Sequence, residues 1–79
     1  MSVISDIAQA GKETKLLKIT YRKSSGEVSE RITEPYEIKA GKYWGYDTEK
    51  DEIRQFFIVN ILSTEILDET YEPRWNIKV

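Results

Sequence analysis

The sequence predicts a mainly β fold, a small five-stranded barrel preceded by one short N-terminal helix. Apolar residues follow a helical spacing over residues 3–12, and from Thr14 onward they change to the two-residue alternation of strands. The alternating runs are short and are separated by polar or glycine-containing turns. With only 79 residues to form a core, we expect the strands to close on themselves, because a closed barrel leaves no unpaired edge.

The predicted helix covers residues 3–12. Ile4, Ile7, Ala8 and Gly11 fall on one face, Ser2 is placed to cap the N-terminus, and Gly11 is placed to end the helix. A helix of two to three turns is not stable alone, so its apolar face must dock on the strands.

The first two predicted strands cover residues 15–23 and 27–40, with Gly26 in the turn between them. Leu17, Ile19 and Tyr21 share one face of the first strand. In the second strand Pro35 marks a bend or an unpaired position, because it has no N–H to donate. The alternation predicts that Val28, Ile32, Tyr36 and Ile38 face inward and that Arg31, Thr33, Glu37 and Lys39 face outward.

Three further strands are predicted at residues 42–47, 53–59 and 62–68. In the first of them Trp44 and Tyr46 share a face, which we assign to the core, and Tyr43 takes the opposite face. The tail, residues 70–79, alternates Trp75, Ile77 and Val79, so it is expected to pack on the barrel or on a second molecule. We therefore expect one domain over residues 1–79, with a helix at 1–13, a barrel at 14–69 and this tail.

The composition argues against an enzyme. The chain has no Cys and no His, which removes the thiolate nucleophile, the usual general base near neutral pH and the commonest zinc ligands. The acidic run at 47–52 lacks the central Gly of a calcium-binding loop, so it predicts a polar hairpin turn. A hydrolase that uses a pair of carboxylates is a further hypothesis, but no spacing of acidic residues in the sequence indicates it. No cofactor and no metal are expected.

The charge is also informative, because the net value of −2 hides an uneven distribution. Residues 1–46 hold eight basic and six acidic side chains, whereas residues 47–79 hold four and eight. Binding of nucleic acid through bulk positive charge is therefore not expected, and any phosphate recognition must come from a local patch. The N-terminus carries no signal-peptide pattern and no stretch is long enough to span a membrane, so a cytoplasmic location is expected.

The order of residues resembles the WYL domain. The runs "ITYRKSSGEVSERITEPYEI", "KYWGYD" and "EIRQFFIVNI" match, in order, an I-x-Y strand, a Gly turn, an Arg before a Pro, an aromatic strand and R-x-F. Lys42 and Trp44 stand where the family's naming tripeptide has Trp and Leu. The resemblance covers about residues 3–69 and implies a stand-alone, SH3-like or Sm-like barrel.

The resemblance also implies candidate ligand-binding residues. Arg54 matches the Arg of R-x-F, Arg31 the Arg before the Pro strand, Tyr21 the tyrosine of I-x-Y, and Tyr43 the central aromatic of the naming motif. Arg54 shares the parity of Phe56, which predicts that it points to the interior side near the rim. Arg31 is predicted to face outward, and Tyr21 and Tyr43 to form a surface platform on which a base could stack.

WYL domains act as ligand-sensing modules in bacterial transcription regulators and occur beside phage-defence systems. The resemblance therefore implies a non-enzymatic regulatory module that binds an anionic ligand, either a nucleotide or single-stranded nucleic acid. The alternative is a protein-interaction module without nucleic-acid binding, whose C-terminal tail adds a strand to a partner or to another copy of the chain.

Overall fold

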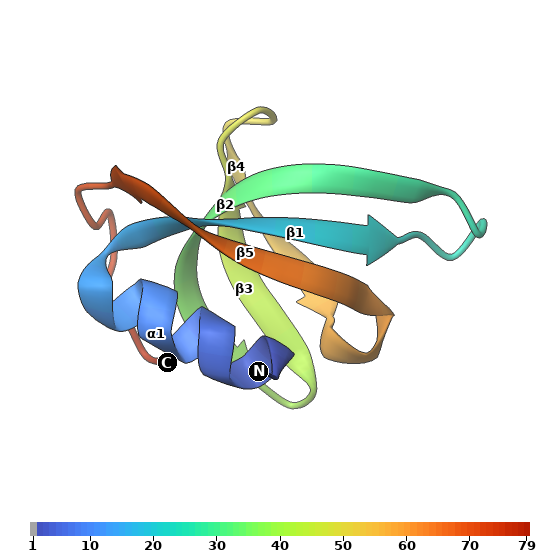
Figure 1. Cartoon of the computed structure of the whole chain (residues 1–79), viewed down its shortest axis with the longest axis horizontal. Coiled ribbons are helices and arrows are strands. Elements are labelled where there is room, and N and C mark those ends of the chain that lie inside the picture. Colours follow the sequence, from blue (N-terminus) through green and yellow to red (C-terminus); the bar gives the residue numbers. More distant parts are fainter. Residues whose placement is uncertain (1) are drawn as a thin grey trace.

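The computed structural model describes residues 2–79, which form one helix and one antiparallel sheet (Figure 1). The elements in chain order are α1 (Val3–Glu13), β1 (Lys15–Arg22), β2 (Val28–Lys39), β3 (Lys42–Asp47), β4 (Glu52–Phe57), the short 3₁₀ helix η1 (Ile58–Asn60) and β5 (Ile61–Thr70). The mainly β fold with five strands and one N-terminal helix is thus confirmed.

The strands follow the order β4-β3-β2-β1-β5 in a single, strongly curved sheet. Among residues 2–79 no ladder joins β4 to β5, so these two strands are edges and the barrel is not closed. The expectation of a closed barrel is therefore wrong. The interior is filled by side chains from the helix and the strands. Their packing holds the curved sheet together without a ladder between its two edges.

Helix α1 begins as predicted, because the Ser2 hydroxyl accepts a hydrogen bond from the Ser5 backbone N–H at 3.0 Å. It ends later than predicted. The helix continues through Gly11 to Glu13, and Thr14 takes the left-handed conformation at φ 50° that terminates it. Gly11 does not end the helix but makes room for the C-terminal tail, because the side chain of Val79 lies where a Cβ on Gly11 would be.

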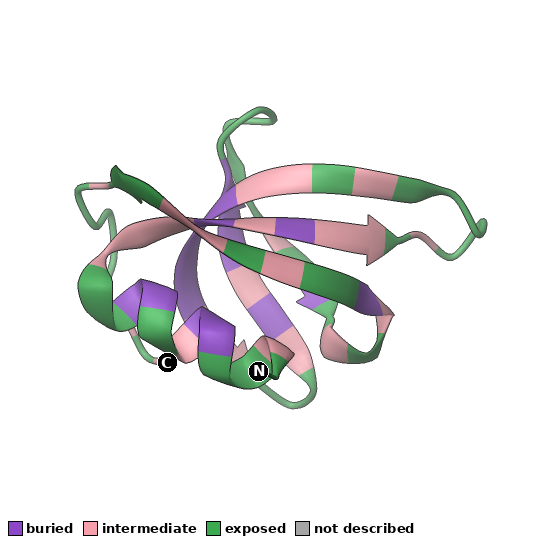
Figure 2. Cartoon of the chain, viewed as in Figure 1, coloured by how far each residue is buried: buried purple, intermediate pink, exposed green. Residues whose placement is uncertain are grey.

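The core lies on the inner face of the sheet, which we define as the face covered by α1. Its buried apolar side chains come from the helix and from four of the strands, and they are Ile7, Ala10, Leu17, Ile19, Tyr43, Phe56 and Ile61. Figure 2 shows buried positions on the side of α1 that faces the sheet and along the centre of the strands. The face assigned to Leu17 and Ile19 in the first strand is therefore correct.

The predicted faces of β2 need correction. Thr33 is fully buried opposite Leu17, and Val28 is exposed, which reverses the prediction for both residues. An irregularity between Pro35 and Glu37 shifts the register, so that Ile38 lies opposite Tyr43 and packs against the core. A simple alternation cannot hold across such a bulge, because the extra residue exchanges the two faces.

The predicted faces of β3 are also wrong. Tyr43 is 0% exposed and stacks on Phe56 in the core, with 5.9 Å between ring centroids. Trp44 and Tyr46 lie on the opposite, outer face, beneath the C-terminal tail. The prediction failed because both faces of β3 are covered, so apolar side chains occur at odd and even positions alike.

The tail packs on its own chain along the free side of β2. Lys78 donates its backbone N–H to the Tyr36 carbonyl at 2.6 Å, and Lys78 and Glu37 form a parallel bridge. At the start of the tail, directly after β5, the Tyr71 hydroxyl donates to the Pro35 carbonyl at 2.7 Å. The tail thereby pairs with a part of β2 that β1 does not reach.

Candidate ligand-binding face

Three of the four sequence-predicted site residues lie on the inner face, at the end of the sheet that α1 does not cover. The register places Tyr21 opposite Ser29 and Arg31 opposite the core residue Ile19. On the edge strand β4, Arg54 lies opposite Gly45 and two residues before Phe56. Since opposite residues of antiparallel strands share a face, Tyr21, Arg31 and Arg54 all project to the same side.

A buried carboxylate lies between the two arginines. Asp47 is 0% exposed and lies opposite Thr33 on β2 and opposite Glu52 on β4, so it is diagonal to both Arg31 and Arg54. One carboxylate oxygen accepts hydrogen bonds from the backbone N–H groups of Glu49, at 3.0 Å, and Lys50, at 3.2 Å. Asp47 therefore fixes the turn between β3 and β4 and contributes a negative charge to the inner face.

Arg31 is held by that carboxylate. Its Nε lies 3.5 Å from the second oxygen of Asp47, and only 15% of its side chain is exposed. The distance is that of an ion pair rather than a strong hydrogen bond, and this oxygen has no hydrogen-bond partner among the described residues. The prediction that Arg31 faces outward is wrong, because the register of β2 turns it toward the inner face.

Arg54 lies where the sequence predicts it, on the inner face beside Phe56 and partly exposed. Within residues 2–79 it takes part in none of the ion pairs. Its cross-strand neighbour Gly45 has no side chain to cover it. Arg54 therefore keeps its planar set of N–H donors available, which is the geometry that suits carboxylate and phosphate groups.

Tyr21 is partly buried and packs edge-on against Phe56, with ring centroids 5.0 Å apart and planes at 77°. The Ser29 hydroxyl opposite Tyr21 is buried and has no hydrogen-bond partner among the described residues. The open end of the inner face thus combines an aromatic ring, an unpartnered hydroxyl and two arginines.

Tyr43 does not belong to this surface. Its hydroxyl lies 2.7 Å from the Thr33 hydroxyl, which itself donates to the Leu17 carbonyl at 2.9 Å. Because the Thr33 proton is used in that way, the Tyr43 O–H is the donor between the two. The predicted surface platform therefore reduces to Tyr21, and Tyr43 is a core residue.

Buried phenols make the fold sensitive to alkaline pH. Burial raises the pKa of Tyr36 to about 12, and burial likewise raises the pKa of Tyr43 and Tyr71 above the ordinary value of 10.0. A phenol with a raised pKa in the folded state contributes stability that is complete below pH 10 and is lost as the pH rises toward the folded pKa. We expect the free energy of unfolding to fall from about pH 10 upward.

The measurement is tyrosinate absorbance recorded together with circular dichroism across this pH range. The expected result is that part of the absorbance appears only as the secondary structure is lost. If all five tyrosines ionised near pH 10 while the fold stayed intact, the burial described here would be contradicted.

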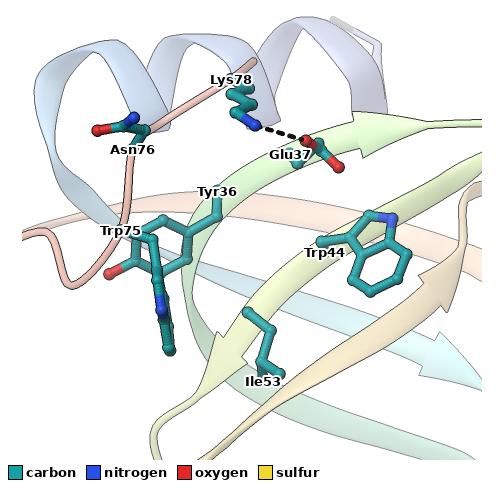
Figure 3. A pocket seen from close by; sticks show the side chains of 7 residues that line it. All are labelled: Tyr36, Glu37, Trp44, Ile53, Trp75, Asn76 and Lys78. Carbon is teal, nitrogen blue, oxygen red and sulfur yellow. Dashed lines mark ion pairs between the residues drawn. The ribbon is translucent and has the colours of Figure 1, made fainter.

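A second feature that the sequence did not predict lies on the outer face. Arg74 from the tail pairs with Glu34, with Nε 3.1 Å from the carboxylate, and its guanidinium lies 4.0 Å from the ring centroid of Tyr46. The next residue, Trp75, meets Tyr36 edge-on with centroids 5.2 Å apart. Beside these contacts the tail and the outer face border an open pocket of about 490 Å³ (Figure 3).

The described residues also bear on metals and membranes. No group of three or more metal-ligating side chains occurs within residues 2–79. Over the same residues, no helix is long and apolar enough to cross a membrane.

Comparison with known families identifies the class of this chain. The family model of the WYL domain matches residues 2–66, so the protein belongs to the WYL domain family. WYL domains are regulatory rather than catalytic, and membership suggests a ligand-sensing module of the kind used in transcription regulation. No curated protein matches the chain significantly.

Among solved structures, the chain is similar to Proteasome accessory factor B/C (PafBC) of Arthrobacter aurescens. The TM-score is 0.74 at 21% sequence identity, and the match covers 95% of this chain and 13% of that chain. At this identity the likeness shows the fold alone. The chain thus spans about an eighth of the length of its structural neighbour.

Proposed function

We propose that this WYL domain binds an anionic ligand at the open end of its inner face, with Arg54 as the principal contact. The observation that supports the proposal is that Arg54 projects to a partly covered, polar end of this face and takes part in no ion pair within residues 2–79. A guanidinium in such a position can form two parallel hydrogen bonds to a phosphate.

Tyr21 and Arg31 complete the proposed site, in which nucleotides or single-stranded nucleic acid are the ligand class. An aromatic ring beside an arginine allows a base to stack while its phosphate is bound, and such stacking is worth roughly 1–3 kcal/mol per base. Asp47 already neutralises Arg31 in part, so Arg31 serves mainly to orient the ligand. The module would act in transcription or phage-defence regulation.

The surrounding charge limits the expected affinity. The chain has a net charge of −2, and Asp47 and Glu52 share the inner face with Arg54. Binding should therefore be weak, local and sensitive to salt, without recognition of a duplex sequence.

The test is fluorescence anisotropy of labelled single-stranded DNA and RNA oligonucleotides at low and physiological salt. We expect binding that weakens as salt rises and that falls at least about tenfold in Arg54→Ala, since one charge-assisted contact contributes roughly 1.5–3 kcal/mol. Arg22→Ala is the matched control. Arg22 is an exposed arginine that follows Tyr21 on β1, so it projects to the other face and should leave binding unchanged.

Absence of binding at low salt by a folded protein would refute the nucleic-acid ligand. Equal loss in Arg22→Ala and Arg54→Ala would show that binding depends on overall charge and not on this site.

A protein-interaction module remains the second candidate function, and one observation favours it. Phe57, Val59 and Leu62 are large apolar residues that follow one another around η1 and remain 52%, 88% and 46% exposed. Exposed apolar side chains that gather in one segment are typical of a docking surface. Affinity through such a surface would change little with salt, which separates it from nucleotide binding.

A further inference from the structure

We propose that the pocket on the outer face binds a proline-rich segment of a partner protein that carries an arginine or lysine next to its prolines. This site is separate from the inner face, because Trp44 and Ile53 lie on the side of β3 and β4 opposite to Tyr43 and Arg54. Three of its seven lining residues come from the tail, which lies beyond the residues matched by the family model.

The walls of the pocket are mostly apolar and are not covered by the chain itself. Tyr36, Trp44 and Trp75 contribute three aromatic rings, and Ile53 lies between the two tryptophans (Figure 3). Trp75 is 52% exposed and Ile53 is 41% exposed. A tryptophan kept half in solvent beside an exposed isoleucine is unfavourable in the free protein, which indicates that another molecule covers them.

The wall formed by the tail is held in place before any ligand arrives. Arg74 is bound to Glu34 and lies on the ring of Tyr46, and its backbone N–H donates to the Tyr36 hydroxyl at 2.9 Å. Trp75 is consequently fixed against Tyr36 and is not free to collapse onto Trp44. A preformed pocket of about 490 Å³ lies within the roughly 300–1,000 Å³ typical of ligand sites, and it costs little ordering entropy on binding.

The chemistry of the pocket fits prolyl rings. A proline-rich segment forms an extended left-handed helix that is already ordered when free, and its rings lie flat on aromatic side chains. Its backbone presents carbonyl acceptors and few donors. The pocket supplies donors in return, an amide from Asn76 and the ammonium of Lys78, which is 67% exposed and only loosely paired with Glu37 at 3.9 Å.

The charge beside the pocket selects a basic flank. Asp51, in the turn before Ile53, accepts a hydrogen bond from the Tyr46 hydroxyl on the outer face, and Glu49 in the same turn is exposed. Lys50 is the single positive side chain in this turn, so its net charge is negative. An arginine or lysine next to the prolines would lie against these carboxylates, which also fixes the direction of the segment.

The test uses a labelled synthetic peptide of two arginines followed by a run of prolines. Fluorescence anisotropy of the label measures the affinity, and the emission of the protein's tryptophans shows whether the peptide binds in the pocket. Both tryptophans of the chain line the pocket, so a ligand that enters it must change their emission. We expect saturable binding with a shift in emission, and at least about tenfold weaker binding of a peptide in which alanines replace the prolines.

Trp75→Ala should weaken the peptide about tenfold, whereas Trp75→Phe keeps an aromatic wall and should bind within about twofold of the wild type. Ile4→Ala changes an apolar residue on α1 that is as exposed as Trp75, at 52%, and lies outside the pocket, so it is the matched control. Anisotropy without a change in emission, or equal affinity for the alanine peptide, would overturn the proposal. Arg54→Ala should leave peptide binding intact, so the two proposed sites can fail independently.

Discussion

Replacing Tyr43 with alanine is expected to leave a large fraction of the protein unfolded at room temperature. Tyr43 is fully buried, stacks on Phe56 and is hydrogen-bonded to Thr33. Removing a buried aromatic ring costs about 3–5 kcal/mol. A domain of this size is expected to have a total stability of only roughly 3–5 kcal/mol, so this loss consumes most of it. Urea denaturation followed by circular dichroism measures the effect.

Tyr43→Phe is the matched control, because it keeps the ring and removes only the hydroxyl. Thr33 still donates to the Leu17 carbonyl, so the expected cost is about 1 kcal/mol. A Tyr43→Ala protein with a denaturation midpoint near that of the wild type would contradict the buried position. Such a result would favour the surface platform that the sequence alone predicts.

Asp47→Ala is expected to produce the second largest loss, about 3 kcal/mol in the free energy of unfolding. The substitution removes the acceptor for two backbone N–H groups of the turn and leaves Arg31, whose side chain is only 15% exposed, without its carboxylate. Breaking a buried pair by removing one partner costs about 3–5 kcal/mol, and the lower end applies because Arg31 is not fully buried. The same denaturation experiment measures it.

Asp47→Asn separates the two contributions. An amide oxygen can still accept from Glu49 and Lys50 while the charge beside Arg31 is gone, so the expected cost is roughly half that of Asp47→Ala. Glu49→Ala, two residues further along the same turn, controls for loss of a carboxylate in this segment, because the Glu49 side chain is exposed and takes part in none of the ion pairs within residues 2–79. Equal midpoints for Asp47→Ala and Glu49→Ala would show that the Asp47 carboxylate is not structural.

The elements could be predicted from the sequence, whereas the faces of two strands could not. The change from helical to alternating spacing located α1 and β1 because each has one buried and one solvated side. Alternation failed for β3, where the core covers Tyr43 on one side and the tail covers Tyr46 on the other. It failed for β2 as well, where the irregularity near Pro35 exchanges the faces.

The candidate site was predicted in the same uneven way. The position of Arg54 follows from its parity with Phe56, which a single strand fixes. The role of Asp47 depends on the pairing of β2 with β3, and in the sequence it is one of several acidic residues in a polar turn. The outer pocket was not predicted, because it requires the tail to return to a particular segment of β2.

The open edge of the sheet has a thermodynamic consequence. Within residues 2–79, β4 forms a ladder with β3 alone, so its separation breaks one ladder and exposes the core residue Phe56. A ligand that holds Arg54 binds only while β4 is in place, so its binding free energy adds to the cost of opening. Phe57 and η1 continue directly from this strand, so the proposed ligand on the inner face would also help to order their exposed apolar side chains. Ligand sensing and partner binding would then be coupled steps of one regulatory module and not alternatives.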